Sequence, residues 1–246
     1  MNELTGKRAL VTGGSSGIGA AIAVALADKG ADVAITYERS ADRAGEVVRA
    51  IEGMGRKALA IQADSADPAA VKRSVSEAAQ ALGGLDILVN NAGIALFGAI
   101  AEIGVAHIDA LLDVNVRSPV LASQAAIPHL PAGGRIVTIG SAGAERIVGD
   151  TGTVYYMTKS ALHLFTRGLA RELGARDITV NLVQPGPIDT DMNPADGESA
   201  ETIRGLTALG RYGAPADIGA AVAFLVSPAA QFVTGSVLTV DGGANA

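Results

Sequence analysis

The stretch that decides the fold is Arg8-Ala9-Leu10-Val11-Thr12-Gly13-Gly14-Ser15-Ser16-Gly17-Ile18-Gly19, which runs into an alanine-rich segment ending near Lys29. The apolar run at residues 8–12 predicts a strand, the glycines predict a turn, and the alanine-rich segment predicts a helix. Strand, glycine turn and helix in this order open a dinucleotide-binding unit, because glycines let the backbone approach a pyrophosphate and the N–H groups at a helix start face the anion. A turn that merely joins a strand to a helix is the alternative, and the flanking elements favour nucleotide binding.

Apolar runs alternate with helical patterns along the rest of the chain. We expect further strands at residues 31–37, 57–61, 86–89, 135–139, 177–183 and 236–240. We expect further helices at residues 40–54, 68–82, 103–116, 118–130, 153–173 and 215–226. Residues from about 190 to 213 are small, polar or turn-forming, which indicates a mobile substrate lid. The alternation predicts a single doubly wound Rossmann-type α/β domain over residues 1–246, with a seven-stranded parallel sheet and helices on both faces.

The composition and charge exclude several classes of function. Hydrophobic residues make up 49% of the 246 positions, which supports a large core. The net charge of −6 has the wrong sign for a protein that follows a phosphate backbone, so we expect no nucleic-acid partner. With no cysteine and 3 histidines that lack ligand spacing, we expect no metal site. Residues 1–7 lack an apolar signal core and no apolar run is long enough to span a bilayer, which predicts a cytoplasmic protein without membrane contact.

The sequence Tyr155-Tyr156-Met157-Thr158-Lys159 places a phenol and an ammonium four residues apart. On a helix these two side chains share one face. A cation near a phenol favours the phenolate, so the pKa of the tyrosine falls towards the range where it exchanges protons near neutral pH. An aromatic residue and a lysine on an ordinary amphipathic helix are the alternative, and Tyr156, three residues from Lys159, is a competitor that the pattern alone does not exclude.

Ser141 follows the apolar run at residues 135–139. The carboxyl ends of parallel strands form the ligand crevice of an open sheet, so a serine at this point is placed to face a ligand. The alternative is that Ser141 simply terminates the strand.

The spacing T-G-x-x-x-G-x-G over residues 12–19 resembles that of the short-chain dehydrogenase/reductase family in its single-domain form. Further motifs follow in family order, namely Asn90-Asn91-Ala92-Gly93, then Asn115, then Ser141 with Tyr155 and Lys159, then Pro185-Gly186-Pro187-Ile188-Asp189-Thr190. The gap between Ser141 and Tyr155 is slightly longer than in many members. The resemblance covers essentially the whole chain, and the family spacing Y-x-x-x-K selects Tyr155 over Tyr156.

The resemblance implies reversible hydride transfer between a nicotinamide and a carbonyl compound or secondary alcohol. The residues that it implies for catalysis are Asn115, Ser141, Tyr155 and Lys159. Ser141 then holds the substrate oxygen, Tyr155 transfers the proton, and Lys159 lowers the pKa of the tyrosine and binds the nicotinamide ribose. Asn115 connects the lysine to a water chain that resupplies protons.

For the cofactor, the resemblance places the residue that discriminates NADP from NAD at Tyr37, which is not acidic. We therefore expect NADP(H) in preference to NAD, with its 2′-phosphate on Arg39 and Ser40. Two features oppose this expectation, because Glu38 repels a phosphate and Ser16 stands where many NADP-dependent relatives carry a basic residue. The residues expected to contact the cofactor are Gly13, Ser15, Ser16, Gly17, Ile18, Gly19, Tyr37, Arg39, Ser40, Asp64, Ser65, Asn91, Ala92, Gly93, Tyr155, Lys159, Pro185, Gly186, Ile188 and Thr190.

Asp64 has two interpretations. The family places an aspartate at this point on the adenine amino group. Alternatively, Asp64 or Asp67 merely starts the helix that Pro68 opens.

The substrate and the class of activity stay open at this point. The sequence is similar to 3-oxoacyl-carrier-protein reductases and related carbonyl reductases, and Arg176 fits the basic residue that binds an acidic carrier, but residues 127–132 lack the expected basic cluster. A non-catalytic dinucleotide-binding sensor is the rival from another class. Sugar-nucleotide epimerases and dehydratases are disfavoured, because they carry a larger carboxyl-terminal substrate domain.

The remaining expectations concern assembly and the histidines. Family members are usually homotetramers, and the apolar end at residues 235–240 is compatible with that assembly. We interpret His107, His129 and His163 as structural or surface residues away from the motifs.

Overall fold

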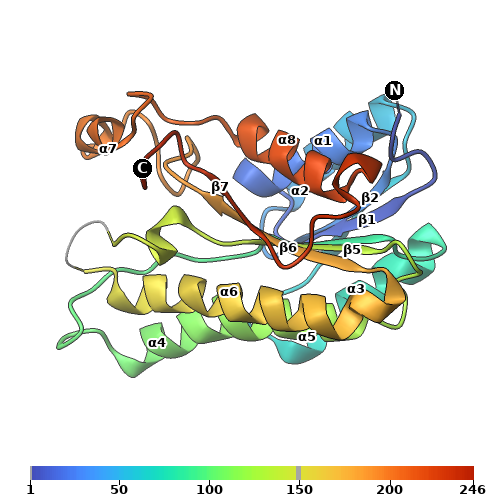
Figure 1. The fold of residues 1–246 in the computed structure, drawn as a ribbon, viewed down its shortest axis with the longest axis horizontal. Helices are drawn as coiled ribbons and strands as arrows, with labels where there is room; N and C mark the ends of the chain where they lie inside the picture. The colour runs from blue at the N-terminus through green and yellow to red at the C-terminus, as the bar shows by residue number, and fades with distance from the viewer. Residues whose placement is uncertain (1, 148–150) are drawn as a thin grey trace.

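Seven parallel strands form one sheet in the computed structural model, in the order β3-β2-β1-β4-β5-β6-β7 (Figure 1). The structure describes residues 2–147 and 151–246. The strands are β1 Arg8–Val11, β2 Asp32–Tyr37, β3 Ala58–Gln62, β4 Ile87–Asn90, β5 Arg135–Ile139, β6 Thr179–Pro185 and β7 Val237–Val240. The α-helices are α1 Gly17–Asp28, α2 Ala41–Gly53, α3 Pro68–Leu82, α4 Val105–Leu112, α5 Ser118–Ala126, α6 Thr153–Leu173, α7 Ala200–Leu206 and α8 Pro215–Val226. This confirms the predicted doubly wound fold class.

Helices cover both faces of the sheet, with α1, α2 and α8 on one side and α3 to α6 on the other (Figure 1). Side chains alternate between the faces of a strand, so each strand feeds two cores. In β1, Ala9 and Val11 join the core beneath α1 and α8, whereas Leu10 joins the core beneath α3 and α5. The strands are rich in Val, Ile and Leu because a parallel sheet of this kind is buried on both faces.

The order of the strands reverses at β1, which lies between β2 and β4. The connections that leave β1 and β4 therefore diverge to opposite sides, and the space between them at the carboxyl ends of the strands forms a crevice. Thr12 and Asn91 follow these two strands, and the Asn91 backbone N–H donates to Thr12 Oγ1 at 3.0 Å. Asn91 lines the crevice.

Three stretches differ from the predicted elements. The helix expected at residues 103–116 is α4 followed by a π-helical segment, Asp113–Arg117, that leads directly into α5. The next expected helix ends at Ala126 and not at residue 130, because Pro128 has no backbone N–H with which to continue the helical hydrogen bonds. The expected irregular stretch near residues 190–213 contains the short helix α7, within which Glu201 and Arg204 form an ion pair.

The described part of the chain contains no helix that combines the length and the apolar character needed to cross a membrane.

Candidate active site

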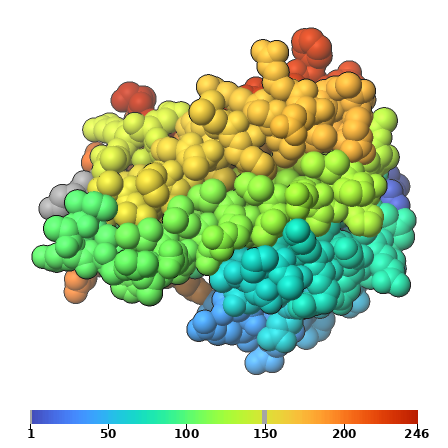
Figure 2. All heavy atoms as spheres, turned by 90° about the horizontal axis from the view of Figure 1, so that it is seen from below, coloured from blue at the N-terminus to red at the C-terminus, as the bar shows by residue number. Residues whose placement is uncertain are grey.

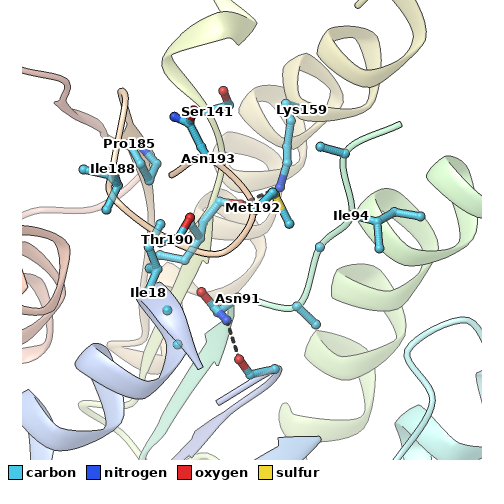
Figure 3. Close-up of a pocket in the computed structure, with 18 of the residues that line it drawn as sticks. Ile18, Asn91, Ile94, Ser141, Lys159, Pro185, Ile188, Thr190, Met192 and Asn193 are labelled. Carbon is cyan, nitrogen blue, oxygen red and sulfur yellow. Dashed lines mark hydrogen bonds between the residues drawn. The ribbon is translucent and has the colours of Figure 1, made fainter. Parts of the chain in front are cut away.

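A cavity of about 940 Å³ opens at the carboxyl ends of the strands. Figure 3 shows residues from the α1 end, the loop after β4, the end of β5, α6 and the segment after β6 converging on it. Every residue predicted to contact the cofactor lines this cavity, and so do Ser141, Tyr155 and Lys159. Asn115, the remaining predicted residue, is buried behind the wall.

The glycine turn fits a phosphate group closely. Gly13 and Gly17 have positive φ angles of 63° and 52°, a conformation that favours glycine. A Cβ at Gly19 would overlap the Gly13 carbonyl oxygen and the Asn91 amide. No side chain of the described residues caps the start of α1 at Ser16. The backbone N–H groups at the start of α1 face the cavity, as they do in an anion-binding helix. These residues therefore fit the pyrophosphate of a dinucleotide.

The Asn90–Gly93 motif holds the glycine turn in place. The Asn91 amide donates to the carbonyl oxygens of Thr12, at 2.9 Å, and Gly13, at 3.0 Å. Figure 3 shows Asn91 at the cavity, with a hydrogen bond from its amide drawn as a dashed line. In return, Thr12 Oγ1 accepts from the backbone N–H groups of Asn91 and Ala92, each at 3.0 Å. The turn after β1 and the turn after β4 are therefore locked together beneath the cavity.

The far end of the cavity carries Tyr37, Arg39, Ser40 and Asp64. Arg39 Nε lies 2.7 Å from a carboxylate oxygen of Glu38, and both side chains are exposed. Glu38 therefore partly neutralises the cation that was expected to receive a phosphate.

The two interpretations of Asp64 are resolved in part by the start of α3. Asp67, and not Asp64, caps this helix, because its side chain accepts from the backbone N–H of Ala69 at 2.8 Å. Asp64 accepts from the backbone N–H of Ala66 at 2.8 Å and lines the cavity.

Tyr155 lies between two aromatic rings at the cavity wall. Its ring centroid is 5.5 Å from that of Phe97 and 5.2 Å from that of Tyr156. Burial raises the pKa of Tyr155 above its ordinary value of 10, whereas a hydrogen bond with Ser141 lowers it. The prediction that Lys159 lowers the pKa of Tyr155 is wrong for the site as described, because removal of the phenol from water outweighs the groups that favour the phenolate.

Lys159 is buried, and burial lowers its pKa to about 8. Its Nζ donates to the carbonyl oxygen of Ile139 at 3.2 Å. Gly93 lies against it, since a Cβ there would come within 3.2 Å of Nζ and 3.3 Å of Asn115 Oδ1. Figure 3 shows the lysine reaching from α6 into the cavity. The glycine thus leaves room for an amine that faces both the sheet and the cavity.

Asn115 lies within the π-helical segment. Its amide pairs with the backbone of Ile94 in both directions and donates to Thr158 Oγ1 at 3.1 Å. Single turns of π-helix are frequent at functional sites because they re-aim side chains. Here the turn aims Asn115 into the protein, towards the loop that carries Gly93 and Ile94.

Tyr156, the competitor of Tyr155, is enclosed by glycines. A Cβ at Gly143 or at Gly152 would overlap its ring. The two glycines therefore leave a slot for the Tyr156 ring, which also lines the cavity.

Several residues at the site were not identified from the sequence. The segment 190–213 contributes Met192, Asn193, Ile203 and Leu206 to the lining, the loop after β5 contributes Arg146, and the last residues of the chain contribute Ala244 and Asn245. Asn245 donates to the Ala142 carbonyl oxygen at 2.8 Å. No spacing in the sequence indicates these contacts, because they join segments far apart along the chain.

Arg176 does not line the cavity, and its guanidinium donates to the carbonyl oxygens of Ile127 and Leu130. A role for this exposed residue in binding an acidic carrier stays a prediction. One expectation about a single residue is wrong. His163 is not remote from the motifs, because its Nε2 lies 3.0 Å from the side-chain nitrogen of Gln184, which also contacts Ser141. No group of three or more His, Cys, Asp or Glu side chains that could hold a metal ion occurs among residues 2–147 and 151–246.

Comparison with known proteins places the chain in a family. A family model described as "Enoyl-(Acyl carrier protein) reductase" matches residues 13–245. A solved short chain dehydrogenase from Burkholderia cenocepacia in complex with NADP is similar, with 57% identity, a TM-score of 0.98 and coverage of 99% of this chain and 100% of that chain. The chain belongs to the short-chain dehydrogenase/reductase family of oxidoreductases.

Two curated relatives carry different descriptions. A versicolorin reductase of Emericella nidulans is 40% identical over 98% of this chain and 97% of its own length. A cyclic-di-GMP-binding biofilm dispersal mediator protein of Escherichia coli is 43% identical over 98% of each chain.

Proposed function

We propose that the protein is an NADP(H)-dependent oxidoreductase that interconverts a small carbonyl compound and a secondary alcohol, with Tyr155 as the general acid and base. One observation carries the proposal: Ser141, Tyr155 and Lys159 meet on the wall of the cavity whose floor is the phosphate-fitting glycine turn. When bound there, the nicotinamide supplies or accepts the hydride.

In the direction of reduction, Ser141 and Tyr155 hold the substrate oxygen by hydrogen bonds. The raised pKa of Tyr155 keeps the phenol protonated at neutral pH, so it has a proton to give as negative charge develops on that oxygen. The hydrogen bond with Ser141 fixes the orientation of the phenol. In the direction of oxidation, the same phenol takes the proton back.

Lys159 supports the reaction from the cofactor side. A pKa of about 8 keeps a large fraction of its amine protonated near neutral pH. In this proposal, the N–H groups of the Lys159 amine face the ribose of the nicotinamide and the proton path. Asn115 holds the loop after β4 in position.

Two observations support NADP(H). Tyr37 offers no carboxylate to the ribose hydroxyls, and Arg39 and Ser40 line the same end of the cavity. The Burkholderia relative was solved with NADP.

The test is the rate of cofactor oxidation with NADPH and with NADH over one panel of ketones, keto esters and sugars. We expect a preference for NADPH and at least one reducible ketone. Tyr155→Phe is expected to lower the rate by about 10²- to 10⁴-fold with cofactor binding retained, whereas the matched control Tyr156→Phe loses far less. A folded, cofactor-bound Tyr155→Phe enzyme that reduced ketones at the parent rate would refute the assignment.

Two other activities stay as alternatives. A 3-oxoacyl-carrier-protein reductase is distinguished by activity on carrier-bound and not on free substrates. A non-catalytic sensor is favoured by the similarity to the Escherichia coli biofilm dispersal mediator protein, which binds cyclic di-GMP. Tight binding of that dinucleotide without ketone reduction would support the sensor.

We also propose that residues 1–246 form one catalytic domain in which residues 190–213 act as a substrate lid. Ile203 and Leu206 of α7 support this, because they line the cavity. Covering the cavity would exclude water from the reacting atoms. A cytoplasmic location belongs to the same proposal and is tested by cell fractionation.

A homotetramer is the assembly that we propose. Helices α4, α5 and α6 lie side by side on one face (Figure 2), where Val105 is 71% and Leu164 74% exposed. Beyond α8, before β7, Phe232 is fully exposed at 100%. Large apolar side chains in such positions are typical of interfaces. Light scattering on the purified protein measures the mass of the assembly. Leu164→Glu is expected to disrupt the contact through the face of α4, α5 and α6. Phe232→Glu is expected to disrupt the contact beyond α8.

A further inference from the structure

Gln184 is a fully buried polar residue, with 0% exposure, near the carboxyl end of β6, between β5 and β7. The register pairs Val183 of β6 with Ile139 of β5, and Gln184 with Thr239 of β7. Gln184 therefore lies beside Gly140, directly before Ser141. A buried amide is unfavourable unless its hydrogen bonds are made, so the partners of the Gln184 side chain explain why it is tolerated here.

The amide nitrogen of Gln184 contacts two groups at once. It donates to the carbonyl oxygen of Ser141 at 2.9 Å and lies 3.0 Å from Nε2 of His163. Its oxygen accepts from Thr239 Oγ1 at 3.5 Å. Turning the amide over would bring its oxygen within 2.9 Å of the Ser141 carbonyl oxygen, where two acceptors repel, so the network itself assigns the nitrogen to this position.

This assignment determines the protonation state of His163. Both hydrogens of the amide nitrogen are used, one for Ser141 and one for His163, so Nε2 of the histidine must accept. His163 is then neutral, with its proton on Nδ1. A protonated His163 would direct an N–H at the amide hydrogens. The repulsion between these donors would push the Gln184 amide out of its place, and with it the donor to the Ser141 carbonyl oxygen.

We propose that His163 is a positioning residue that, in its neutral form, holds Ser141 in place through Gln184 and releases it when protonated. The proposal rests on the proposed function, in which Ser141 holds the substrate oxygen. His163 touches neither substrate nor cofactor in this scheme and acts through the amide alone.

The contacts of Ser141 show what the release changes. Its carbonyl oxygen accepts from Gln184 and, at 3.0 Å, from the backbone N–H of Ala144. Its Oγ accepts from the backbone N–H of Gly143 at 3.2 Å. Without Gln184, the Ser141 peptide keeps the bonds to its own loop and loses the side-chain bond that ties it to β6. The hydroxyl then loses its fixed distance from Tyr155.

The charged groups around His163 come from two elements. Glu145, in the loop after Ser141, favours the protonated ring, and Arg167, on α6 itself, opposes it. Strands β6 and β7 contribute the uncharged Gln184 and Thr239. Burial is the largest influence and lowers the pKa of His163 below its ordinary value of 6.5, so the neutral form prevails at neutral pH and protonation belongs to the acid side.

The experiment compares pH profiles of ketone reduction for the parent, His163→Gln and Gln184→Met. The control is His129→Gln, at an exposed histidine in the turn after α5. In the parent and the control, kcat is expected to fall at acid pH. The midpoint of this fall is expected to match the pKa of His163 measured by NMR of its ring. His163→Gln keeps an acceptor for Gln184 and does not titrate, so it is expected to lose this acid step and keep its rate at neutral pH. Gln184→Met is expected to lower kcat about fivefold at neutral pH, the effect of one lost hydrogen bond, with cofactor affinity unchanged.

A direct readout separates positioning from mere stability. The pKa of His163 is expected to rise in Gln184→Met, because the partner that requires the neutral ring is gone. In the parent, the backbone NMR signals of Ser141 and Ala142 are expected to follow the titration of His163. An acid step that persists in His163→Gln, or Ser141 signals that ignore the titration, would overturn the proposal. A parent that reduces no ketone would refute the proposed function instead, while the NMR titration would still decide whether His163 controls Ser141.

Discussion

The side chain of Asn115 pairs with the backbone of Ile94 through two hydrogen bonds, one in each direction. Its Oδ1 accepts from the N–H of Ile94 and its Nδ2 donates to the Ile94 carbonyl oxygen, both at 2.9 Å. The same Nδ2 contacts Thr158 Oγ1, which in turn donates to the carbonyl oxygen of Tyr155 at 2.6 Å. One buried amide thus connects the loop after β4 to the first turn of α6, which bear the two sides of the proposed active site.

Asn115→Ala is expected to lower the free energy of unfolding by about 1–3 kcal/mol, because it leaves the half-buried N–H and carbonyl groups of Ile94 without these partners. We expect the rate of ketone reduction to fall as well, since the Tyr155 turn loses its support. Denaturant unfolding and steady-state kinetics measure the two effects. Thr158→Val is the control, because it removes the link to Tyr155 and keeps the pairing with Ile94. Equal destabilisation by the two variants would contradict this account.

Gly19→Ala is expected to abolish cofactor binding. Its Cβ would overlap the Gly13 carbonyl oxygen, a backbone atom that cannot move without opening the turn. Gly168→Ala is the matched control, since Gly168 also lies within a helix and has no atom within 4 Å of an added Cβ. The control is expected to raise the free energy of unfolding by about 0.5–1 kcal/mol, because alanine favours helix. Titration of NADPH by fluorescence, with circular dichroism to verify folding, distinguishes the two variants. A Gly19→Ala protein that bound NADPH normally would show that the turn adapts.

Glu38→Gln is expected to strengthen binding of NADPH without affecting NADH. The carboxylate of Glu38 pairs with Arg39 and repels a 2′-phosphate, so its removal frees the guanidinium and reduces the repulsion. Arg39→Gln is expected to act in the opposite direction. Dissociation constants for both cofactors at low ionic strength measure the effects, because exposed charges are screened by salt. If neither variant changed the ratio of the two constants, the phosphate would have to bind elsewhere.

Lys159→Met tests the burial of the amine through the pH dependence of stability. The pKa of Lys159 is about 8 in the folded protein and 10.5 in its ordinary state, so between these values the unfolded chain binds a proton that the folded protein does not. Stability from this group therefore rises with pH from about 8 to 10.5 and is constant below 8. The difference in unfolding free energy between parent and variant is expected to grow in favour of the parent by at most about 3 kcal/mol over this window. Parallel stability curves for the two proteins would show that the amine is solvated.

Much of the fold was predictable because its determinants are local. The bounds of α3, β5, α6 and α8 agree with the predicted ranges, since each has a regular apolar pattern between clear turn residues. The π-helical segment at 113–117 was not predicted, because its residues continue a helical pattern and only the pairing of Asn115 with Ile94 makes the extra turn favourable. For α7, seven residues within a polar stretch gave too short a pattern to identify.

For the site, the motifs indicated which residues meet, and the fold decided how. Asp64 and Asp67 are equivalent in the sequence, and the geometry at the start of α3 alone shows which one caps the helix. The spacing of Tyr155 and Lys159 suggested a lowered tyrosine pKa, but burial of the phenol outweighs that effect. Burial depends on the rings and helices around a group, which no local spacing records.

By itself, the amino-acid sequence determined the alternation of strands and helices, the glycine turn and the order of the motifs, since all of these follow from backbone preferences and side-chain periods within short stretches. Only the tertiary structure decided that Gln184 joins His163 to Ser141. These residues come from three elements and have no fixed spacing, and a hydrogen bond between them exists only because the register of β5 with β6 and the packing of α6 bring their atoms within 3.0 Å.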